Sequence, residues 1–307
     1  MTLNQLTILI KIIELKKFST AAEELYVTQS AISHSIADLE SELGVKLIQR
    51  GRDGVYPTET GIKVLKYARI IATNMECIKQ EISASLKLQT GEVKIGSFGG
   101  VSANFLPGII RLFKLKYPKV SIKIFEGTEG EIKDWILSST IDIGFITFPC
   151  SNSLKTIPLI SDDMTVVLPE THILAAQKSI SIEQLTKYSM MITWNSNCQT
   201  LVQKAFKSST GRFPQWKYKV SNIATLLAMI KEGLGIAIMP KFTLPEYIPN
   251  VKILPLKPVL KRKIGLASIV PFSELSPAAS VFVELTLKWI ENNYKVTERL
   301  EKNGEYL

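Results

Sequence analysis

The sequence predicts an α/β protein with a helical N-terminal domain, one long helix and a larger C-terminal domain. The chain has 307 residues, about twice the length of a usual single domain. Apolar residues recur every three or four positions through residues 1–43 and again through 58–88. From Gly91 onward, short apolar strands alternate with helical segments, which is typical of α/β organisation.

The composition excludes several classes of protein. Hydrophobic residues make up 46% and charged residues 21%, as in ordinary globular chains. The longest apolar stretches are shorter than the ~18 residues that a membrane span needs, so we expect no membrane segment. The first residues lack the pattern of a signal peptide, and we expect a cytoplasmic protein.

The three cysteines, Cys77, Cys150 and Cys198, are too far apart to match a zinc site. An odd number of distant cysteines fits reduced thiols in a reducing compartment. We therefore expect no metal and no cofactor.

The net charge of +9 is distributed unevenly. Residues 1–58 contain 6 basic and 7 acidic side chains, whereas residues 89–307 contain 26 and 18. The basic surplus of the C-terminal part is typical of a solvated surface. Any nucleic-acid binding by the first segment must therefore come from particular residues and not from its net charge.

The first 43 residues predict three helices. Apolar spacing indicates a first helix from Leu3 to about Lys16. The Thr20 to Glu23 sequence has the form of a capping box and predicts the start of a second, short helix. Thr28 is expected to cap a third helix that ends at Gly44.

The third helix leaves a polar face exposed. Small or hydrogen-bonding side chains at such a face can approach base edges in the major groove. They are Gln29, Ser30, Ser33 and His34, with Thr28 at the cap. Two short helices joined by a tight turn form a helix-turn-helix, so double-stranded DNA is the expected partner.

Residues 47–50 and 55–56 predict two short strands around a tip between Gly51 and Gly54. This hairpin would form a wing, from which Arg50 and Arg52 can contact phosphates or a narrow minor groove. The alternative is a solvent-exposed turn whose arginines have no special role.

From residue 58 to 88 the apolar residues keep helical spacing for about eight turns. A helix this long has little of its own chain to pack against. Its apolar stripe therefore predicts a homodimer formed by two copies of the helix.

The C-terminal part contains a succession of predicted strands and helices. Strands are predicted at 93–96, 121–125, 141–146, 165–168, 190–194 and 235–240. Helices are predicted at 106–116, 131–139 and 222–232.

With these motifs in place, the chain resembles the LysR-type transcriptional regulators along essentially its whole length. The N-terminal motifs are FSTAA at 18–22, VTQSAIS at 27–33 and LGVKL at 43–47, followed by Arg50, Thr58 and Gly61. The C-terminal landmarks include LP at 106–107, YP at 117–118 and GLGIA at 233–237.

The resemblance implies a winged helix-turn-helix at 1–58, a linker and dimerisation helix at 59–90 and an effector-binding domain at 91–307. That domain would be periplasmic-binding-protein-like and two-lobed, with lobe one at about 91–161 and 267–300 and lobe two at about 162–266. A small-molecule effector would bind between the lobes. Homodimers would assemble into homotetramers on DNA.

Carried onto this chain, the resemblance implies a set of effector-binding residues. They are Ser97, Gly100, Ser102, Thr128, Thr147, Ser196, Asn197 and Asn222. Glycine permits close backbone approach, and free N–H groups at helix N-termini favour an anionic effector. The alternative for each serine or threonine is an ordinary helix cap.

An enzyme and an architectural DNA-binding protein are the two alternatives to a regulator. No catalytic constellation stands out, so we expect no enzyme. An architectural DNA-binding protein remains an alternative, and ligand-dependent DNA binding would separate it from a sensor. Cys198 lies where thiol-sensing family members keep a reactive cysteine, but no second cysteine follows closely, and a small buried thiol is expected.

Overall fold

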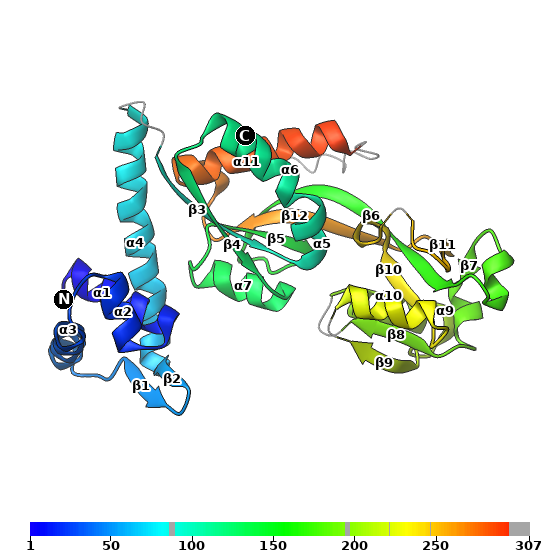
Figure 1. The fold of residues 1–307 in the computed structure, drawn as a ribbon, viewed down its shortest axis with the longest axis horizontal. Coiled ribbons are helices and arrows are strands. Elements are labelled where there is room, and N and C mark those ends of the chain that lie inside the picture. The colour runs from blue at the N-terminus through cyan, green and yellow to red at the C-terminus, as the bar shows by residue number, and fades with distance from the viewer. Residues whose placement is uncertain (86–89, 194–196, 221, 246, 295–307) are drawn as a thin grey trace.

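The computed structural model describes residues 1–85, 90–193, 197–220, 222–245 and 247–294. Three bodies lie in a row: a helical N-terminal domain beside a long upright helix, and then two α/β lobes (Figure 1). The α/β class and the two-lobed C-terminal domain predicted from the sequence are confirmed. None of the described helices is both long and apolar enough to span a bilayer.

The N-terminal domain is a winged helix-turn-helix. Its elements are α1 (Leu3–Leu15), α2 (Phe18–Glu24), α3 (Gln29–Leu43), β1 (Ile48–Gly51) and β2 (Gly54–Pro57). A small core of fully buried side chains joins all three helices to the hairpin. Its central members are Leu9, Ile12, Ile32, Leu39 and Leu47.

The predicted capping box at Thr20 is wrong. Helix α2 begins two residues earlier, at Phe18, and Thr20 lies inside its first turn. Lys17 occupies the N-cap position without a side-chain capping bond. Phe18 is partly buried and packs against the domain core, and this apolar contact favours the earlier helix start.

The cap predicted for the third helix is confirmed. The Thr28 Oγ1 accepts a hydrogen bond from the Ala31 N–H at 3.2 Å, and Gly44 ends the helix in a left-handed conformation. Near the end of α3 the buried Glu40 carboxylate accepts hydrogen bonds from the Leu47 and Ile48 N–H groups. The Lys46 Nζ forms an ion pair with the Glu40 Oε2 at 2.7 Å. Glu40 therefore fastens the third helix to the wing.

Helix α4 (Glu59–Ser85) is shared between domains. Leu65 and Ala68 pack in the core of the N-terminal domain. Further along, the buried Gln80 donates to the Glu92 carbonyl oxygen at 3.1 Å and accepts from the Ala278 N–H at 3.2 Å. The N-terminal half of α4 is thus held by the N-terminal domain, and its C-terminal half is held by lobe one.

Lobe one is a sheet covered by helices. Its elements are β3 (Gly91–Ser97), α5 (Gly99–Asn104), α6 (Leu106–Lys116), β4 (Val120–Glu126), α7 (Glu129–Leu137) and β5 (Ile143–Phe148). The terminal helix α11 (Pro277–Asn293) returns to pack on this lobe through Phe282 and Ile290. Helix α7 starts two residues before the predicted 131, because Thr128 and Glu131 form a capping box.

Two long strands connect the lobes. Strand β6 (Lys155–Pro169) runs unbroken from lobe one into lobe two, and β12 (Lys261–Ser268) returns antiparallel beside it. The expected boundary at 161/162 lies inside β6. The expected boundary at 266 lies inside β12, whose residues 263–267 pair with β5 of lobe one.

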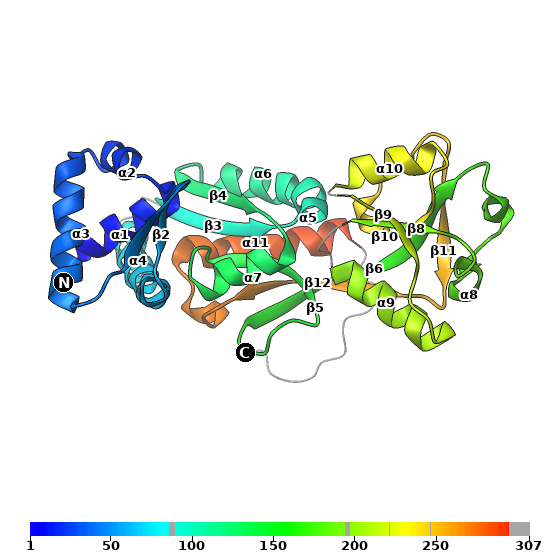
Figure 2. The same ribbon diagram turned by 90° about the horizontal axis from the view of Figure 1, so that it is seen from below.

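Lobe two continues the sheet around β6. Its elements are η1 (Ile173–Ala176), β7 (Ile180–Ser181), α8 (Ile182–Leu185), β8 (Met190–Thr193), α9 (Asn197–Thr210), β9 (Trp216–Val220), α10 (Ile223–Lys231), β10 (Ala237–Pro240), η2 (Lys241–Thr243) and β11 (Val251–Lys257). Helices α9 and α10 face lobe one across the gap between the bodies (Figure 2). The short η3 (Phe272–Glu274) precedes α11.

Candidate DNA interface and effector cleft

The predicted DNA-contacting residues of α3 lie together and are exposed. Gln29, Ser30, Ser33 and His34 have exposed side chains on the first turns of the helix. The His34 Nδ1 lies 3.2 Å from the Ser30 carbonyl oxygen, and the Thr28 and Ser30 hydroxyls are 3.0 Å apart. The helix therefore presents a continuous polar face at its N-terminal end, as recognition in a major groove requires.

The wing brings both predicted arginines to the same end of the domain. Arg50 lies over the Phe18 ring, 5.5 Å from its centroid, and Arg52 occupies the exposed hairpin tip. The hairpin is pinned to the end of α1, because the Val55 N–H donates to the Lys16 carbonyl oxygen at 2.9 Å. A Cβ on Gly54, whose φ is +135°, would lie 2.6 Å from that oxygen.

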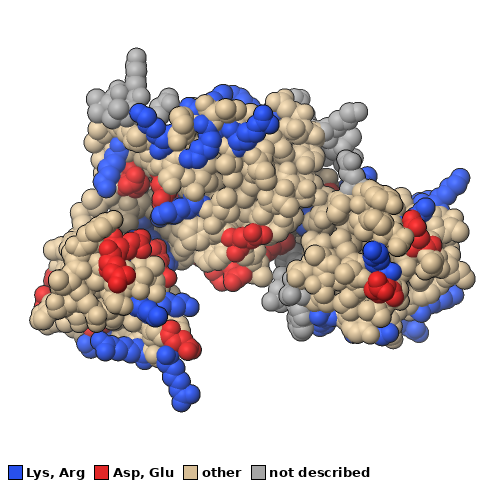
Figure 3. Space-filling model, in the orientation of Figure 1, with Lys and Arg blue, Asp and Glu red and all other residues tan. Residues whose placement is uncertain are grey.

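Basic side chains lie along the wing end of this domain. On the face shown in Figure 3, Lys and Arg side chains line this lower end, and Asp and Glu side chains lie above them and also beside the lowest basic group. This arrangement explains how a segment without net positive charge can present a basic edge to phosphates.

A cleft of about 730 Å³ lies between the two lobes. Lobe one contributes the start of α5 and the β4–α7 connection, and lobe two contributes residues of β8, α9, α10 and β10. Most of the lining is apolar and includes Phe98, Ile223, Leu227, Ile238 and Met239. Such a mixture of apolar walls and a few polar groups is typical of small-molecule sites.

A buried charged cluster lies at the back of the cleft, where β6 and β12 cross between the lobes. The Arg262 Nη2 is 2.8 Å from the Asp162 Oδ2, and both side chains are about 5% exposed. The Asp162 Oδ1 also accepts from the Phe242 N–H at 3.0 Å. Burial raises the pKa of Asp162, although Arg262 opposes the shift.

Arg262 also contacts one residue from each lobe, Cys198 of lobe two and Phe98 of lobe one. Its Nη1 donates to the Cys198 Sγ at 3.7 Å, and its guanidinium lies 5.7 Å from the Phe98 ring centroid. Cys198 is buried, as expected, and burial raises the pKa of its thiol against the opposing effect of Arg262. A raised pKa disfavours the reactive thiolate.

The structure brings only part of the predicted effector set to the cleft. Gly100, Thr128 and Asn222 line it, and the latter two also cap α7 and α10. A Cβ on Gly100 would lie 2.5 Å from the Thr243 Cγ2, so the backbone approaches closely there.

The other predicted residues that the structure describes are not part of the cleft lining. Ser97 is fully buried and accepts a hydrogen bond from the Ser102 hydroxyl at 3.0 Å, and neither residue lines the cleft. Thr147 is buried and donates to Glu129 beside a neighbouring hollow that contains Cys150. Asn197 is the first residue of α9, and Ser196 lies outside the described residues.

Sequence reasoning missed the charged residues of the cleft. Arg262 lies between two lysines in a strand, and Asp162 is followed by Asp163. Alternation along a strand turns every second side chain inward, which was the available signal. Glu129, whose pKa is raised by burial against the Thr147 hydrogen bond, could not be distinguished from a solvated residue.

Two family models together match nearly the whole chain. Residues 3–62 match the bacterial regulatory helix-turn-helix protein of the lysR family, and residues 87–290 match the LysR substrate binding domain. The chain belongs to the LysR family of transcriptional regulators. The resemblance predicted from the sequence is thereby confirmed, as is the expectation of a regulator in place of an enzyme.

Relatives of this LysR-type regulator support the assignment. The uncharacterized HTH-type transcriptional regulator YvbU of Bacillus subtilis is 34% identical over 291 residues, 93% of this chain and 97% of that protein. A full-length OxyR variant from Pseudomonas aeruginosa has a TM-score of 0.77 at 22% identity, with 95% of each chain covered. The effector binding domain of QuiR in complex with shikimate has a TM-score of 0.60 at 23% identity, covering 66% of this chain and 99% of that one.

Proposed function

We propose that this LysR-type regulator binds its operator through the exposed face of α3 and the wing, and that a small molecule in the cleft between the lobes controls that binding. The observation that carries the proposal is the cleft itself. It takes its walls from both lobes, and two strands connect those lobes beside it. A ligand that contacts both walls stabilises one lobe orientation over others.

The lining favours an effector with an apolar body. Among the lining residues that the structure describes, Arg262 is the one basic side chain, and it is already paired with Asp162. Three carboxylates, those of Glu126, Glu129 and Glu131, lie on the lobe-one wall. Support for the anionic class expected from the sequence is therefore limited to backbone N–H groups at helix starts such as that of α10.

Helix α4 supports the proposed oligomer. Met75 and Ile78 expose 38% and 60% of their surface on the part of the helix between the two domains. Apolar side chains at this spacing favour pairing with a second copy. We propose a homodimer through α4, assembly of two dimers into a tetramer on DNA, and action in the cytoplasm.

The first test is a fluorescence-anisotropy titration of the purified protein against duplexes from the region upstream of its own gene, at fixed salt with non-specific competitor. Gln29→Ala should weaken specific binding by about 1–3 kcal/mol and relax sequence preference, because a glutamine can make a paired contact with adenine. The matched control is Glu23→Gln, an exposed change on α2. Unchanged specificity in Gln29→Ala would exclude this contact.

The second test addresses control by the cleft. Ala224 is exposed on α10 and lines the cleft, so Ala224→Trp should fill the site without disturbing a core. We expect the variant to bind operator DNA but to lose its response to any compound that shifts wild-type binding. A retained response would place the effector elsewhere, and DNA binding that no compound changes would favour the architectural alternative.

A further inference from the structure

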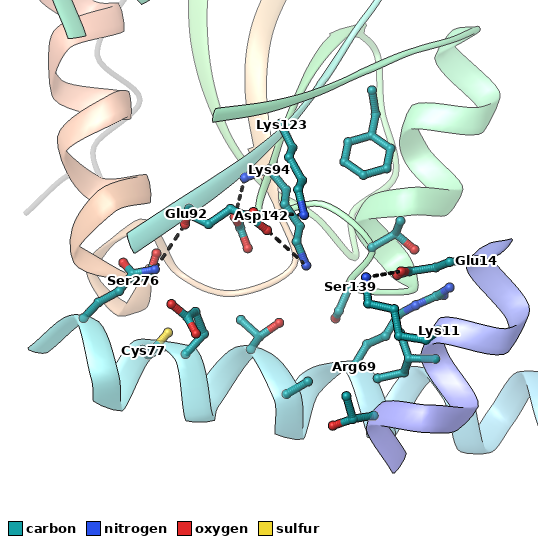
Figure 4. A pocket seen from close by; sticks show the side chains of 18 residues that line it. Lys11, Glu14, Arg69, Cys77, Glu92, Lys94, Lys123, Ser139, Asp142 and Ser276 are labelled. Atoms are coloured by element: carbon teal, nitrogen blue, oxygen red, sulfur yellow. Dashed lines mark hydrogen bonds and ion pairs between the residues drawn. The ribbon is translucent and has the colours of Figure 1, made fainter. Parts of the chain in front are cut away.

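A second cavity lies at the junction of three parts of the molecule (Figure 4). It has a volume of about 580 Å³, and its walls come from α1, α4 and lobe one. None of its lining residues belongs to the effector cleft. It is therefore a separate site.

Arg69 of α4 lines this junction cavity with a guanidinium group that is not fully hydrogen-bonded. Its buried Nε has no hydrogen-bond partner, and no carboxylate forms an ion pair with it within the described ranges. Burial lowers the pKa of its guanidinium, although Glu14 on α1 opposes the shift. By contrast, Lys11 on α1 already contacts two carboxylates, those of Glu14 and Glu24.

The wall formed by lobe one contributes two further basic side chains, Lys94 and Lys123. Lys123 and Lys94 share the single Glu92 carboxylate, at Nζ to oxygen distances of 3.0 and 3.9 Å. Asp142 accepts the backbone N–H of Lys94 at 2.7 Å. Burial raises the pKa of Asp142, whereas the Lys94 backbone N–H and the Lys94 charge oppose the shift.

Neutral donors complete the lining. The hydroxyl groups of Thr73, Ser139 and Thr140 belong to the same cavity. The walls also carry the carboxylates of Glu14, Glu76, Glu92 and Asp142, so a bound anion must be small enough to reach Arg69 without contacting them. Arginine and lysine with nearby hydroxyls are the side chains that recognise phosphate and carboxylate oxygens.

We propose that the junction cavity binds a small oxyanion, a phosphate or a carboxylate, with Arg69 as its principal ligand and Lys94 and Lys123 as secondary ones. The bound anion would join bodies that are otherwise connected through α4. Ala68, next to Arg69, packs in the DNA-binding domain, whereas Gln80 is fastened to lobe one. Occupancy would thus favour one orientation of the DNA-binding domain relative to lobe one.

The test is isothermal titration of the full chain without DNA, at constant ionic strength, with inorganic phosphate in one arm and malonate in the other. We expect saturable binding of at least one anion. Arg69→Gln should weaken it at least tenfold and Lys123→Gln a few-fold. The arm that binds distinguishes a phosphate site from a carboxylate site.

Two controls locate the binding. Lys66→Gln removes an exposed charge from the same helix outside the cavity, and Ala224→Trp fills the effector cleft. Both should bind the anion like the wild type. The proposal is overturned if neither anion binds, if Lys66→Gln weakens binding as much as Arg69→Gln, or if Ala224→Trp abolishes it.

Folding is checked separately, because Arg69 is half-buried. If Arg69→Gln fails to fold, Lys123→Gln carries the test, since the Lys123 side chain is 52% exposed. Full-strength anion binding by Lys123→Gln would then contradict the proposed site. Hydrogen exchange adds an independent readout: the bound anion should slow exchange in α1 and β4, which face each other across the cavity.

Discussion

At the scale of single residues, two buried carboxylates have different roles. Glu40 accepts two backbone N–H groups and one lysine, and it fastens the recognition helix to the wing. Asp162 pairs with Arg262 where the chain passes between the lobes. Each is surrounded by donors because an unpaired buried carboxylate is strongly destabilising.

The Glu40 carboxylate predicts a pH dependence of the DNA-binding domain. Burial alone would raise the pKa of Glu40, but the hydrogen bonds from Lys46, Leu47 and Ile48 outweigh it, and the pKa lies below the ordinary 4.5. A lowered carboxyl pKa stabilises the fold above the unfolded-state pKa, and this stabilisation is lost as the pH falls through the folded-state pKa.

Glu40→Gln should therefore destabilise the domain by about 1–3 kcal/mol at pH 7, because it removes charge-assisted hydrogen bonds. The difference from wild type should shrink as the pH falls below the ordinary pKa of 4.5. Hydrogen-exchange protection of the α3 and β1 amides measures it. Asp38→Asn, an exposed change on the same helix, is the control, and a difference that stays constant with pH would contradict the assignment.

At the scale of elements, α4 divides its apolar stripe between three environments. Leu65 and Ala68 are buried in the DNA-binding domain, Ala72 lines the junction cavity, and Met75 and Ile78 are exposed. The sequence stripe, predicted as one dimerisation surface, is thus partly used within the protomer. Among the described residues of this stripe, Met75, Ile78 and Ile82 stay exposed and can pack against a partner copy.

Met75→Lys should convert the protein to monomers, because a lysine in a paired apolar surface is desolvated without a partner. Light scattering coupled to size exclusion should show half the mass of the wild-type dimer. Lys66→Gln, an exposed change on the opposite side of the same helix from Met75, should keep the parental mass. A parental mass for Met75→Lys would contradict dimerisation through this surface.

In the whole molecule, the two lobes are connected by the paired strands β6 and β12. Strands β6 and β12 pair along the crossing, with Asp162 opposite Arg262 in the register. Because Arg262 also contacts Cys198 of α9 and Phe98 of lobe one, the ion pair is positioned between both lobes. Its loss should therefore affect the entire effector-binding domain.

Asp162→Asn leaves the buried Arg262 without a charge partner, which typically costs about 3–5 kcal/mol. The double change Asp162→Leu with Arg262→Met should cost less, because no uncompensated charge remains. Urea unfolding followed by tryptophan fluorescence compares the variants. Asp163→Asn, an exposed neighbour, serves as the control, and a double variant as unstable as the single one would contradict an unpaired-charge mechanism.

Features that depend on local periodicity and turn chemistry could be predicted from the sequence. The spacing of apolar residues located α1, α3 and α4, and Thr28 and Gly44 marked the ends of the recognition helix. Motif order identified the family, and the polar face of α3 followed from a single helical turn pattern. These features involve residues that are close in the chain.

Contacts between residues that are distant in the chain became evident in the tertiary structure. It started α2 at Phe18, whose partly buried ring packs against the domain core, and it left Ser97, Ser102 and Thr147 out of the cleft lining. It also joined Asp162 to Arg262, 100 residues apart, and assembled the junction cavity from α1, α4 and lobe one. Strand register and domain packing set these contacts, and neither leaves a local signal in one sequence, because burial depends on the whole fold.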